Sequence, residues 1–403
     1  MWSRGIYFAC KIEEICYLKQ WHALFNQILS REEKMMGKCK SFGLGLIVIA
    51  LIFTHLIGLV AEKKVQAADD FISKQTIVGE GDFVDASKYT KKGPYRIGFS
   101  NGFSGNSWRK MCIASLQREA KKYSEIEDLI ILDGQGDVNK QINDIESLMA
   151  QEVDAILVIA NSGTAVIPVL REATKLGIVT LPFNLPVEGE DFTAYVGVDP
   201  ANKGERNAQF LKGAVGNNAK IVALGGLPGN SYTAAGWGAA EAVLKAAGAD
   251  VLAFRDAYWE EDRAKVIMSD LIAAYPQIDG VWADGGQVST GALKALLAAN
   301  KPLIPVCGDD YNGLLRMYDR YKDKFPEFKF SAISEPTWES AIALRTALQI
   351  LKGEKVHFKQ MIKPKRITPD NYKDYFRSDL PDAVFVDTEL SDKELSEIFG
   401  VSN

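Results

Sequence analysis

Short apolar runs alternate with segments of helical spacing from residue 95 onward. In the first series the apolar runs cover residues 95–100, 129–132, 155–160 and 178–183, and the segments between them cover 107–123, 138–150 and 164–176. Continuous apolar runs separated by helices are typical of parallel strands that are covered on both faces. The pattern therefore predicts a parallel sheet with helical connections.

The same alternation restarts near residue 195. Its apolar runs cover 195–198, 220–224, 251–254, 280–283 and 303–307, and its helical segments cover 203–213, 236–247, 263–275 and 291–299. Two successive series of similar size favour two packed units over one large sheet. We therefore predict an α/β fold of two doubly wound parallel-sheet lobes with a cleft between them.

An export signal is predicted at residues 35–67. Residues 42–60 are nineteen residues without Asp, Glu, Lys or Arg, Lys38 and Lys40 precede them, and the small-residue site Val65-Gln66-Ala67 follows. This order matches a cleavable secretory signal. With the signal at this place, we expect residues 1–34 to result from a mis-assigned upstream start of translation. Residues 68–93 would form a polar N-terminal extension. An uncleaved membrane anchor is the alternative, because nineteen apolar residues are about enough to span a bilayer.

The end of the chain differs from the body. Residues 367–403 are polar and aromatic, with Pro369, Pro381 and a final amphipathic stretch at 392–399. We interpret this segment as a C-terminal strap packed on the body, with a flexible tail as the alternative.

Charge excludes one class of partner. The chain has 47 Lys/Arg and 52 Asp/Glu; nine and five of these fall in residues 1–67, which leaves 38 against 47, or −9, for the body. A body that acidic is poorly suited to hold a nucleic-acid backbone, so we expect no nucleic-acid partner.

Few residues are available for catalysis or metal binding. His357 is the last of three histidines, and no zinc spacing, nucleophile elbow or phosphate-loop lysine is present. We expect no cofactor, no metal site and no enzyme activity; an exported hydrolase using His357 or the Asp309-Asp310 pair is the weaker alternative. Cys112 and Cys307 are expected as two buried thiols, although a disulfide between them stays open.

Polar and aromatic residues follow the predicted strands at their carboxyl ends, where open α/β sheets bind ligands. Carboxylates, amides and guanidinium groups can satisfy sugar hydroxyls, and aromatic faces can cover the C–H side of a sugar ring. The candidate ligand-binding residues are Phe103, Asn106, Trp108, Arg109, Asn184, Tyr232, Trp259, Asp284, Gln287, Asp309 and Ser334. Ser334 and its neighbour Glu335 fit either a ligand contact or a hinge, whereas Trp237, Trp282 and Trp338 are interpreted as packing residues.

Several motifs resemble those of the periplasmic sugar-binding proteins of the ribose- and galactose-binding type. The motifs are Val153-Asp154-Ala155-Ile156, the helix start at Asp199, the GxxGNS loop at 226–231 and Leu351-Lys352-Gly353-Glu354. The stretch FSNGFSGNSWR at 99–109 is similar to the opening of galactofuranose-type receptors, which implies that Trp108 stacks on the sugar and Arg109 donates to its hydroxyls. The resemblance covers residues 95–354.

This resemblance implies a type I periplasmic binding protein with three hinge crossings, near residues 193–197, 331–336 and 354–366. Lobe 1 would then cover 94–193, completed by 337–353, lobe 2 would cover 194–331, and 354–403 would form the hinge return and the strap. It also implies a monomeric receptor, exported to the periplasm or held at the cell surface, that delivers a monosaccharide to an ABC permease and its ATPase. A sensing module for a membrane signalling receptor is the alternative within the same fold.

Three positions depart from the family pattern. Asn184 stands where Asp is usual, Ala234-Ala235 where Arg is usual, and Gly285 where Asn is frequent. The departures predict a changed specificity, such as a furanose, a methylated sugar or a ligand that is not a sugar.

Overall fold

The structure is a computed structural model that describes residues 71–401. The predicted upstream extension 1–34 and signal 35–67 lie outside the described residues. Within the part described, no helix is both long and apolar enough to cross a membrane.

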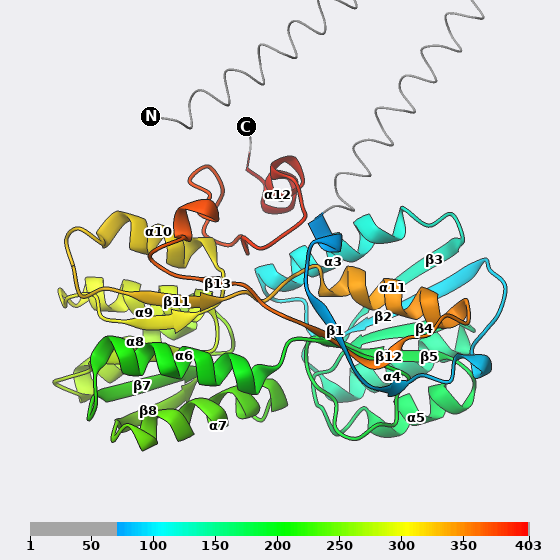
Figure 1. The fold of residues 1–403 in the computed structure, drawn as a ribbon, viewed down its shortest axis with the longest axis horizontal. Coiled ribbons are helices and arrows are strands. Elements are labelled where there is room, and N and C mark those ends of the chain that lie inside the picture. The colour runs from blue at the N-terminus through cyan, green and yellow to red at the C-terminus, as the bar shows by residue number, and fades with distance from the viewer. Residues whose placement is uncertain (1–70, 402–403) are drawn as a thin grey trace, which may run out of the picture. The chain divides into compact units, whose positions relative to one another are not determined.

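Lobe 1 is a parallel four-stranded sheet in the order β3-β2-β4-β5 (Figure 1). The strands are β2 (Tyr95–Asn101), β3 (Ile126–Asp133), β4 (Ala155–Ile159) and β5 (Val179–Pro182). The helices are α3 (Ser107–Ala120), α4 (Val138–Ala150), α5 (Ile167–Lys175) and α11 (Glu339–Leu351). Helix α11 packs against α3 although more than 200 residues separate them in sequence, because the chain returns to this lobe late.

Lobe 2 is a six-stranded sheet in the order β13-β11-β10-β9-β7-β8, parallel except for β13. Its strands are β7 (Lys220–Gly225), β8 (Asp250–Asp256), β9 (Gly280–Ala283), β10 (Val306–Gly308), β11 (Phe330–Ile333) and β13 (Arg366–Ile367). Its helices are α6 (Pro200–Val215), α7 (Ser231–Ala246), α8 (Glu261–Ala274), α9 (Gly286–Ala298) and α10 (Asn312–Tyr321). The predicted class, two parallel-sheet lobes with helices between the strands, is confirmed.

Three strands form a small sheet beside the crossings between the lobes. In it β12 (His357–Ile362) lies between β1 (Ile77–Phe83), which is antiparallel to it, and β6 (Tyr195–Gly197), which is parallel. The described chain passes between the lobes three times: after β6, between β11 and α11, and between β12 and β13 (Figure 1). Strand β1 comes from the segment interpreted as a polar extension, so that interpretation missed a strand.

Polar side chains fix where the helices begin. Asn106, Asp137, Asp199 and Asn230 each cap a helix by accepting a hydrogen bond from a backbone N–H of its first turn. Such caps satisfy donors that have no partner inside the helix, and each is worth about 1 kcal/mol. Three of these capped helices, α3, α6 and α7, begin beside the cavity that lies between the lobes.

Buried apolar residues fill both lobes. Trp282 and Trp338 are among the largest fully buried side chains, and the ring of Trp237 lies 5.1 Å from that of Trp282, as expected for packing residues. Cys112 and Cys307 are free and buried, and burial raises the pKa of each thiol to about 12.

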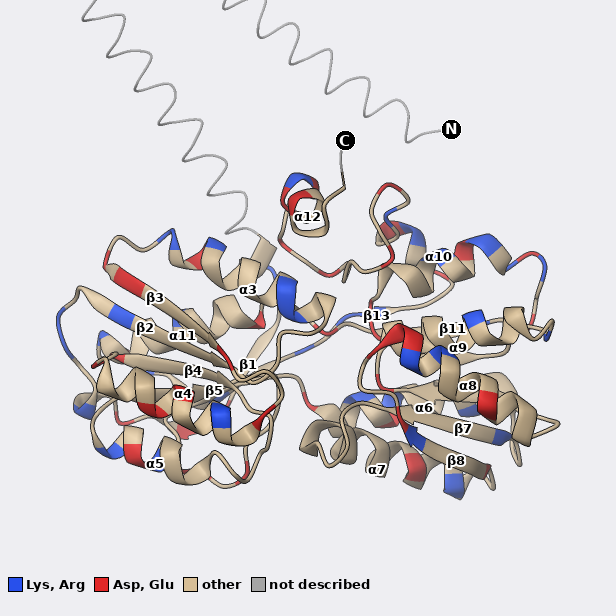
Figure 2. Cartoon of the chain, turned by 180° about the vertical axis from the view of Figure 1, so that it is seen from behind, with Lys and Arg blue, Asp and Glu red and all other residues tan. Residues whose placement is uncertain are grey.

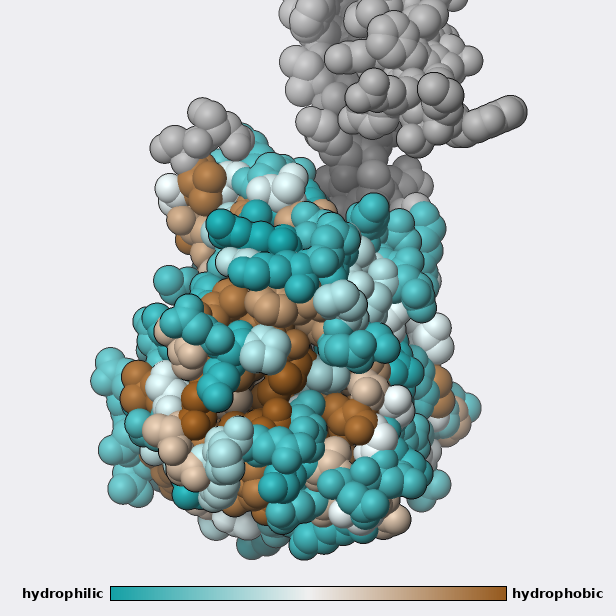
Figure 3. Space-filling view, turned by 90° about the vertical axis from the view of Figure 1, so that its left-hand side faces the viewer, coloured by the Kyte–Doolittle hydropathy of each residue, from teal (hydrophilic) through white to brown (hydrophobic). Residues whose placement is uncertain are grey.

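The surface shows two features. Acidic and basic residues are interspersed over the helices of both lobes (Figure 2). At the end of lobe 2, apolar side chains surround a shallow hollow (Figure 3), which is lined by Ile272, Tyr275, Pro276, Gln277, Ile278, Leu296, Lys301, Pro302 and Ile304.

The C-terminal strap contains a 3₁₀ turn, η2 (Tyr372–Asp374), and a final helix, α12 (Asp392–Phe399). A second 3₁₀ turn, η1 (Ala86–Lys88), follows β1. Ser391 and Glu394 form a reciprocal capping box at the start of α12, and Gly400 ends it in the left-handed conformation.

Candidate ligand-binding site

A cavity lies between the lobes, where the strands of both sheets end. It is open at its mouth, and side chains from both lobes line it. Nine of the eleven predicted residues line it: Asn106, Trp108, Arg109, Asn184, Tyr232, Trp259, Asp284, Gln287 and Asp309. Leu185, Lys203, Glu335 and Phe385 complete the lining.

The lobe 1 wall is the first turn of α3. The Asn106 side chain accepts a hydrogen bond from the backbone N–H of Arg109 (3.0 Å), which fixes where the helix starts. Trp108 Nε1 donates to the backbone oxygen of Glu335 (2.8 Å) and so ties α3 to the second crossing. Arg109 Nη1 donates to Asn101 Oδ1 (2.9 Å), and burial lowers the pKa of Arg109 to about 10. Its guanidinium remains charged at neutral pH.

The lobe 2 wall consists of residues at the ends of β9 and β10. Asp284 Oδ2 accepts hydrogen bonds from Thr233 Oγ1 (2.5 Å) and Trp259 Nε1 (3.3 Å). Burial raises the pKa of Asp284 to about 7 and that of Asp309 to about 6. The buried Gln287 Oε1 has no hydrogen-bond partner among the described residues, so it is available to a ligand donor.

Trp259 is held in place by an unusual turn. Tyr258 and Trp259 both have positive φ, 60° and 54°, a conformation that side chains other than glycine adopt at a cost of about 1–2 kcal/mol. A Cβ on Gly226 would lie 2.2 Å from the Trp259 ring, so glycine is required where the loop after β7 meets this ring. The turn therefore places the indole against the cavity.

A buried ion network lies behind these walls. Lys203 Nζ contacts Asp309 Oδ1 at 2.5 Å, Glu335 Oε2 at 2.7 Å and the Tyr232 hydroxyl at 2.9 Å. Burial opposes the ammonium charge, but Asp309 and Glu335 outweigh it and raise the pKa of Lys203 well above its usual value. Lys203 donates hydrogen bonds to Glu335 and Tyr232 and forms an ion pair with Asp309, so it positions the two carboxylates.

Glu335 connects this network to both lobes. Its Oε1 accepts from Asn184 Nδ2 (2.7 Å) and its Oε2 from the Tyr232 hydroxyl (2.5 Å). Asn184 has φ 62°, a left-handed conformation in which asparagine is several-fold enriched. Its backbone oxygen also accepts from the Tyr195 hydroxyl (2.9 Å), so Asn184 joins the first crossing to the second.

Charge and aromatic faces define what the cavity can bind. It holds the carboxylates of Asp284, Asp309 and Glu335 against two cations, Lys203 and Arg109, a formal balance of −1. The carboxylates can accept bonds from hydroxyl donors, and Arg109 can donate to hydroxyl oxygens. Trp108 and Trp259 supply aromatic faces. This combination fits a neutral molecule with several hydroxyl groups.

Two predicted residues lie outside the lining. Ser334 is fully buried; its hydroxyl accepts from the Lys365 N–H (2.9 Å) and its N–H donates to the Lys365 oxygen (2.9 Å). It joins the second crossing to the third, which is the hinge interpretation. The Phe103 ring lies against Gly105, in the loop before α3.

Residues 97–355, more than half of the chain, match the family of periplasmic binding protein domains. The chain belongs to this family.

Two sequence relatives and one structure illustrate the match. The ribose import binding protein of Bacillus subtilis is 27% identical over 66% of this chain and 84% of its own length. A xylitol-binding protein of Mycolicibacterium smegmatis is 30% identical over 60% of this chain and 69% of its own length. An ABC transporter solute-binding protein from Bacillus halodurans with bound myo-inositol superposes with a TM-score of 0.65 at 22% identity, covering 71% of this chain and 98% of that one. The predicted family is therefore confirmed.

The structure places an acid, Glu335, against Asn184, and the cation Lys203 pairs with the same carboxylate. The sequence does not mark Lys203, but the packing of its helix explains its burial. A Cβ on the next residue, Gly204, would lie 1.9 Å from the Gly236 oxygen, so α6 and α7 pack closely and bury this face of α6.

Proposed function

We propose that this protein is an exported receptor that captures a neutral polyhydroxylated ligand, a monosaccharide or a sugar alcohol, and delivers it to an ABC importer. One observation carries the proposal: carboxylates, a guanidinium and indole rings from both lobes line one cavity at the carboxyl ends of their strands. The names of the relatives, which bind ribose, xylitol or myo-inositol, agree with this ligand class.

Each wall has a distinct role. Asp284, Asp309 and Gln287 of lobe 2 accept hydrogen bonds from ligand hydroxyls, since all three line the cavity and carry acceptor oxygens. Arg109 of lobe 1 donates to hydroxyl oxygens, and the Trp108 indole covers the C–H face of the ligand. Because the acceptors come from lobe 2 and the donor from lobe 1, the ligand binds best when the lobes are closed, and it shifts the population toward that state.

Export of the protein and delivery of the ligand to a permease and its ATPase are part of the proposal because the chain belongs to this family. The hydrolase alternative has weak support. His357 lies on β12 outside the cavity lining, with its Nδ1 2.9 Å from the Gly81 oxygen. Asp310 uses its carboxylate to accept the backbone N–H groups of Glu335 (2.9 Å) and Asp387 (2.7 Å), a structural role.

Thermal unfolding against a ligand panel tests the proposal. The panel contains pentoses, hexoses in pyranose and furanose forms, pentitols, cyclitols and, as a contrast, sugar acids. A ligand at a hundred times its dissociation constant adds about 2.7 kcal/mol of stability and raises the unfolding midpoint by several degrees. We expect a neutral member to give this shift and the sugar acids to give none.

Variants then locate the site. Trp108→Ala and Arg109→Ala should remove the shift, whereas Lys110→Ala, at an exposed neighbour on α3, should keep it. A panel without any neutral hit, or a hit that survives both cavity substitutions, contradicts the proposal.

A further inference from the structure

The family match ends at residue 355, and the chain continues for nearly fifty residues beyond it. The segment 377–399, called the clasp here, holds on to both lobes and reaches the cavity. Its attachments on each side are specific, and they are buried or part-buried.

On lobe 2 the clasp is fixed to the start of α10. Asn312 Nδ2 donates to the backbone oxygens of Arg377 (2.8 Å), Leu380 (3.1 Å) and Pro381 (3.1 Å), and its Oδ1 accepts from the Arg377 N–H (3.0 Å). Arg316 Nε pairs with Asp382 Oδ1 at 2.7 Å. Because Asn312 is fully buried and uses both ends of its amide, this attachment is rigid.

A second lobe 2 attachment lies next to the cavity. The N–H groups of Val386 and Asp387 donate to the Asp310 oxygen (2.9 Å) and to Asp310 Oδ2 (2.7 Å). Phe385 bridges to Tyr311 as an antiparallel neighbour, and their rings meet edge to face at 5.6 Å. The Phe385 side chain lines the cavity.

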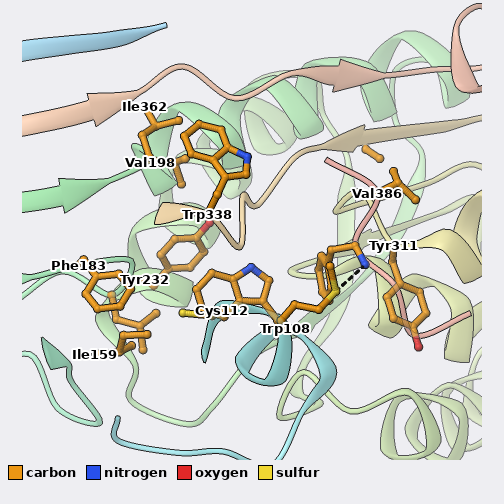
Figure 4. Close-up of a cluster of buried hydrophobic side chains, with 14 of the residues drawn as sticks. Trp108, Cys112, Ile159, Phe183, Val198, Tyr232, Tyr311, Trp338, Ile362 and Val386 are labelled. Carbon is orange, nitrogen blue, oxygen red and sulfur yellow. Dashed lines mark hydrogen bonds between the residues drawn. The ribbon is translucent and has the colours of Figure 1, made fainter. Parts of the chain in front are cut away.

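On lobe 1 the clasp is fixed to α3. The Phe385 N–H donates to Met111 Sδ (3.4 Å). Trp108 of α3 and Val386 of the clasp belong to the same cluster of buried side chains (Figure 4). The Ser115 hydroxyl donates to Glu389, and Arg118 pairs with Glu394 of α12. The fully buried Leu395 anchors α12 in the core.

Chain length turns these contacts into a restraint. Asp387 is bound to lobe 2 and Glu389 to lobe 1, and only Thr388 lies between them. Two residues span at most about 7 Å even when fully extended. The edge of lobe 2 at Asp310 therefore cannot move far from α3 unless one set of contacts breaks.

We propose that the clasp limits how far the lobes open on the α3 side and completes the ligand cavity with the ring of Phe385. The restraint on opening does not depend on the ligand, whereas the role of Phe385 rests on the proposed function. Separate measurements test the two parts.

Distances between spin labels on the ligand-free full-length chain test the restraint. The labels are placed at Lys121→Cys, at the end of α3, and Lys324→Cys, after α10, with Cys10, Cys16 and Cys39 replaced by serine. Cys112 and Cys307 stay, because both are buried. We expect one narrow distribution of label distances in this protein when the clasp is unchanged.

Two substitutions release the clasp. Arg118→Ala removes the ion pair to Glu394, and Leu395→Asp places a charge where a fully buried side chain anchors α12; both should add a population with a longer distance. Lys393→Ala, at a largely exposed position of α12, should leave the distribution unchanged. An unchanged distribution in both variants, with hydrogen exchange showing that the amides of 384–399 are freed, overturns the restraint. If Leu395→Asp fails to fold, the distance distribution of Arg118→Ala alone tests the restraint.

Calorimetry tests the cavity role of Phe385, with D-ribose, xylitol and myo-inositol as probes. Phe385→Ala should weaken binding of a bound probe at least tenfold, and Val386→Ala, at the adjacent clasp residue outside the lining, should not. Equal affinities of the two variants for the probe would refute a contact between Phe385 and the ligand. If no probe binds the parent protein, the proposed ligand class fails, while the label distances still decide the restraint.

Discussion

Removing the buried cation of the cavity is the sharpest test of how the site is held together. In Lys203→Met the volume of the side chain is largely kept, but Asp309 and Glu335 lose the ammonium that lies 2.5 and 2.7 Å from their oxygens. All three residues are at most 6% exposed, so the loss of the ammonium leaves two largely buried carboxylates without it. Breaking a buried ion pair by deleting one side costs about 3–5 kcal/mol, because the other charge stays buried.

The loss should depend on pH in a defined direction. Without Lys203 the Asp309 carboxyl takes up a proton more readily, and burial already raises the pKa of Asp309 to about 6. A pKa shift of one unit corresponds to about 1.4 kcal/mol. We therefore expect the free energy of unfolding to fall by about 3–5 kcal/mol at pH 7.5, and the fall to be about 1–3 kcal/mol smaller at pH 5.

Urea unfolding of the two proteins at both pH values, followed by tryptophan fluorescence, measures this difference. Lys212→Met is the matched control, since Lys212 is on the same helix, α6, but exposed; it should change the free energy of unfolding by less than about 0.5 kcal/mol. A loss in Lys203→Met that equals the control, or that is the same at both pH values, would falsify the assignment of Lys203 as the residue that neutralises the cavity carboxylates.

Three further predictions concern single groups. Asp284 has a folded pKa raised to about 7, so the free energy of unfolding should fall as pH rises from about 4 to about 7, and Asp284→Asn should reduce this slope in pH-dependent unfolding. Gly226→Ala forces a Cβ into the Trp259 ring, so it should weaken ligand binding and shift the tryptophan emission, while Gly238→Ala, with open space at its Cβ, should not. Cys112 and Cys307, with thiol pKa values raised by burial, should resist a thiol reagent in the native protein and react after unfolding; fast native labelling contradicts their burial.

The fold could be predicted where strands are buried on both faces. Strands β2 and β4 are almost entirely buried, so most of the residues that form them must be apolar or small, and the apolar runs mark them directly. Strand β1 carries no such signal because six of its seven residues are exposed, and it is held by pairing with β12 more than by burial. Such an edge strand places few constraints on its sequence.

The cavity residues that directly follow buried strands could also be predicted from the sequence, for a geometric reason. Residues directly after a buried strand must appear at the carboxyl edge of its sheet, which is why the sequence alone could assign Asp284 and Asp309 to the cavity. Lys203 has no such marker, because it is one polar residue within a helix that carries several. Phe385 is still harder to find, since the clasp has no apolar rhythm and only its fold brings it to α3 and α10.

Asn184, Glu335 and Lys203 bear on which ligands the cavity can select. Asn184 donates to Glu335, and Glu335 in turn pairs with Lys203, so these two charges are satisfied within the protein. Because this pair uses its charges internally, it can shape the cavity wall without offering a free charge to the ligand. The groups left toward the ligand then carry the selectivity. They are two carboxylates, an amide oxygen and one guanidinium, which can accept several hydroxyl donors and give an anionic ligand no net attraction. A receptor built this way discriminates by the arrangement of hydroxyl groups and ring faces, and a change at Lys203 would alter affinity by misplacing Asp309 instead of by removing a ligand contact.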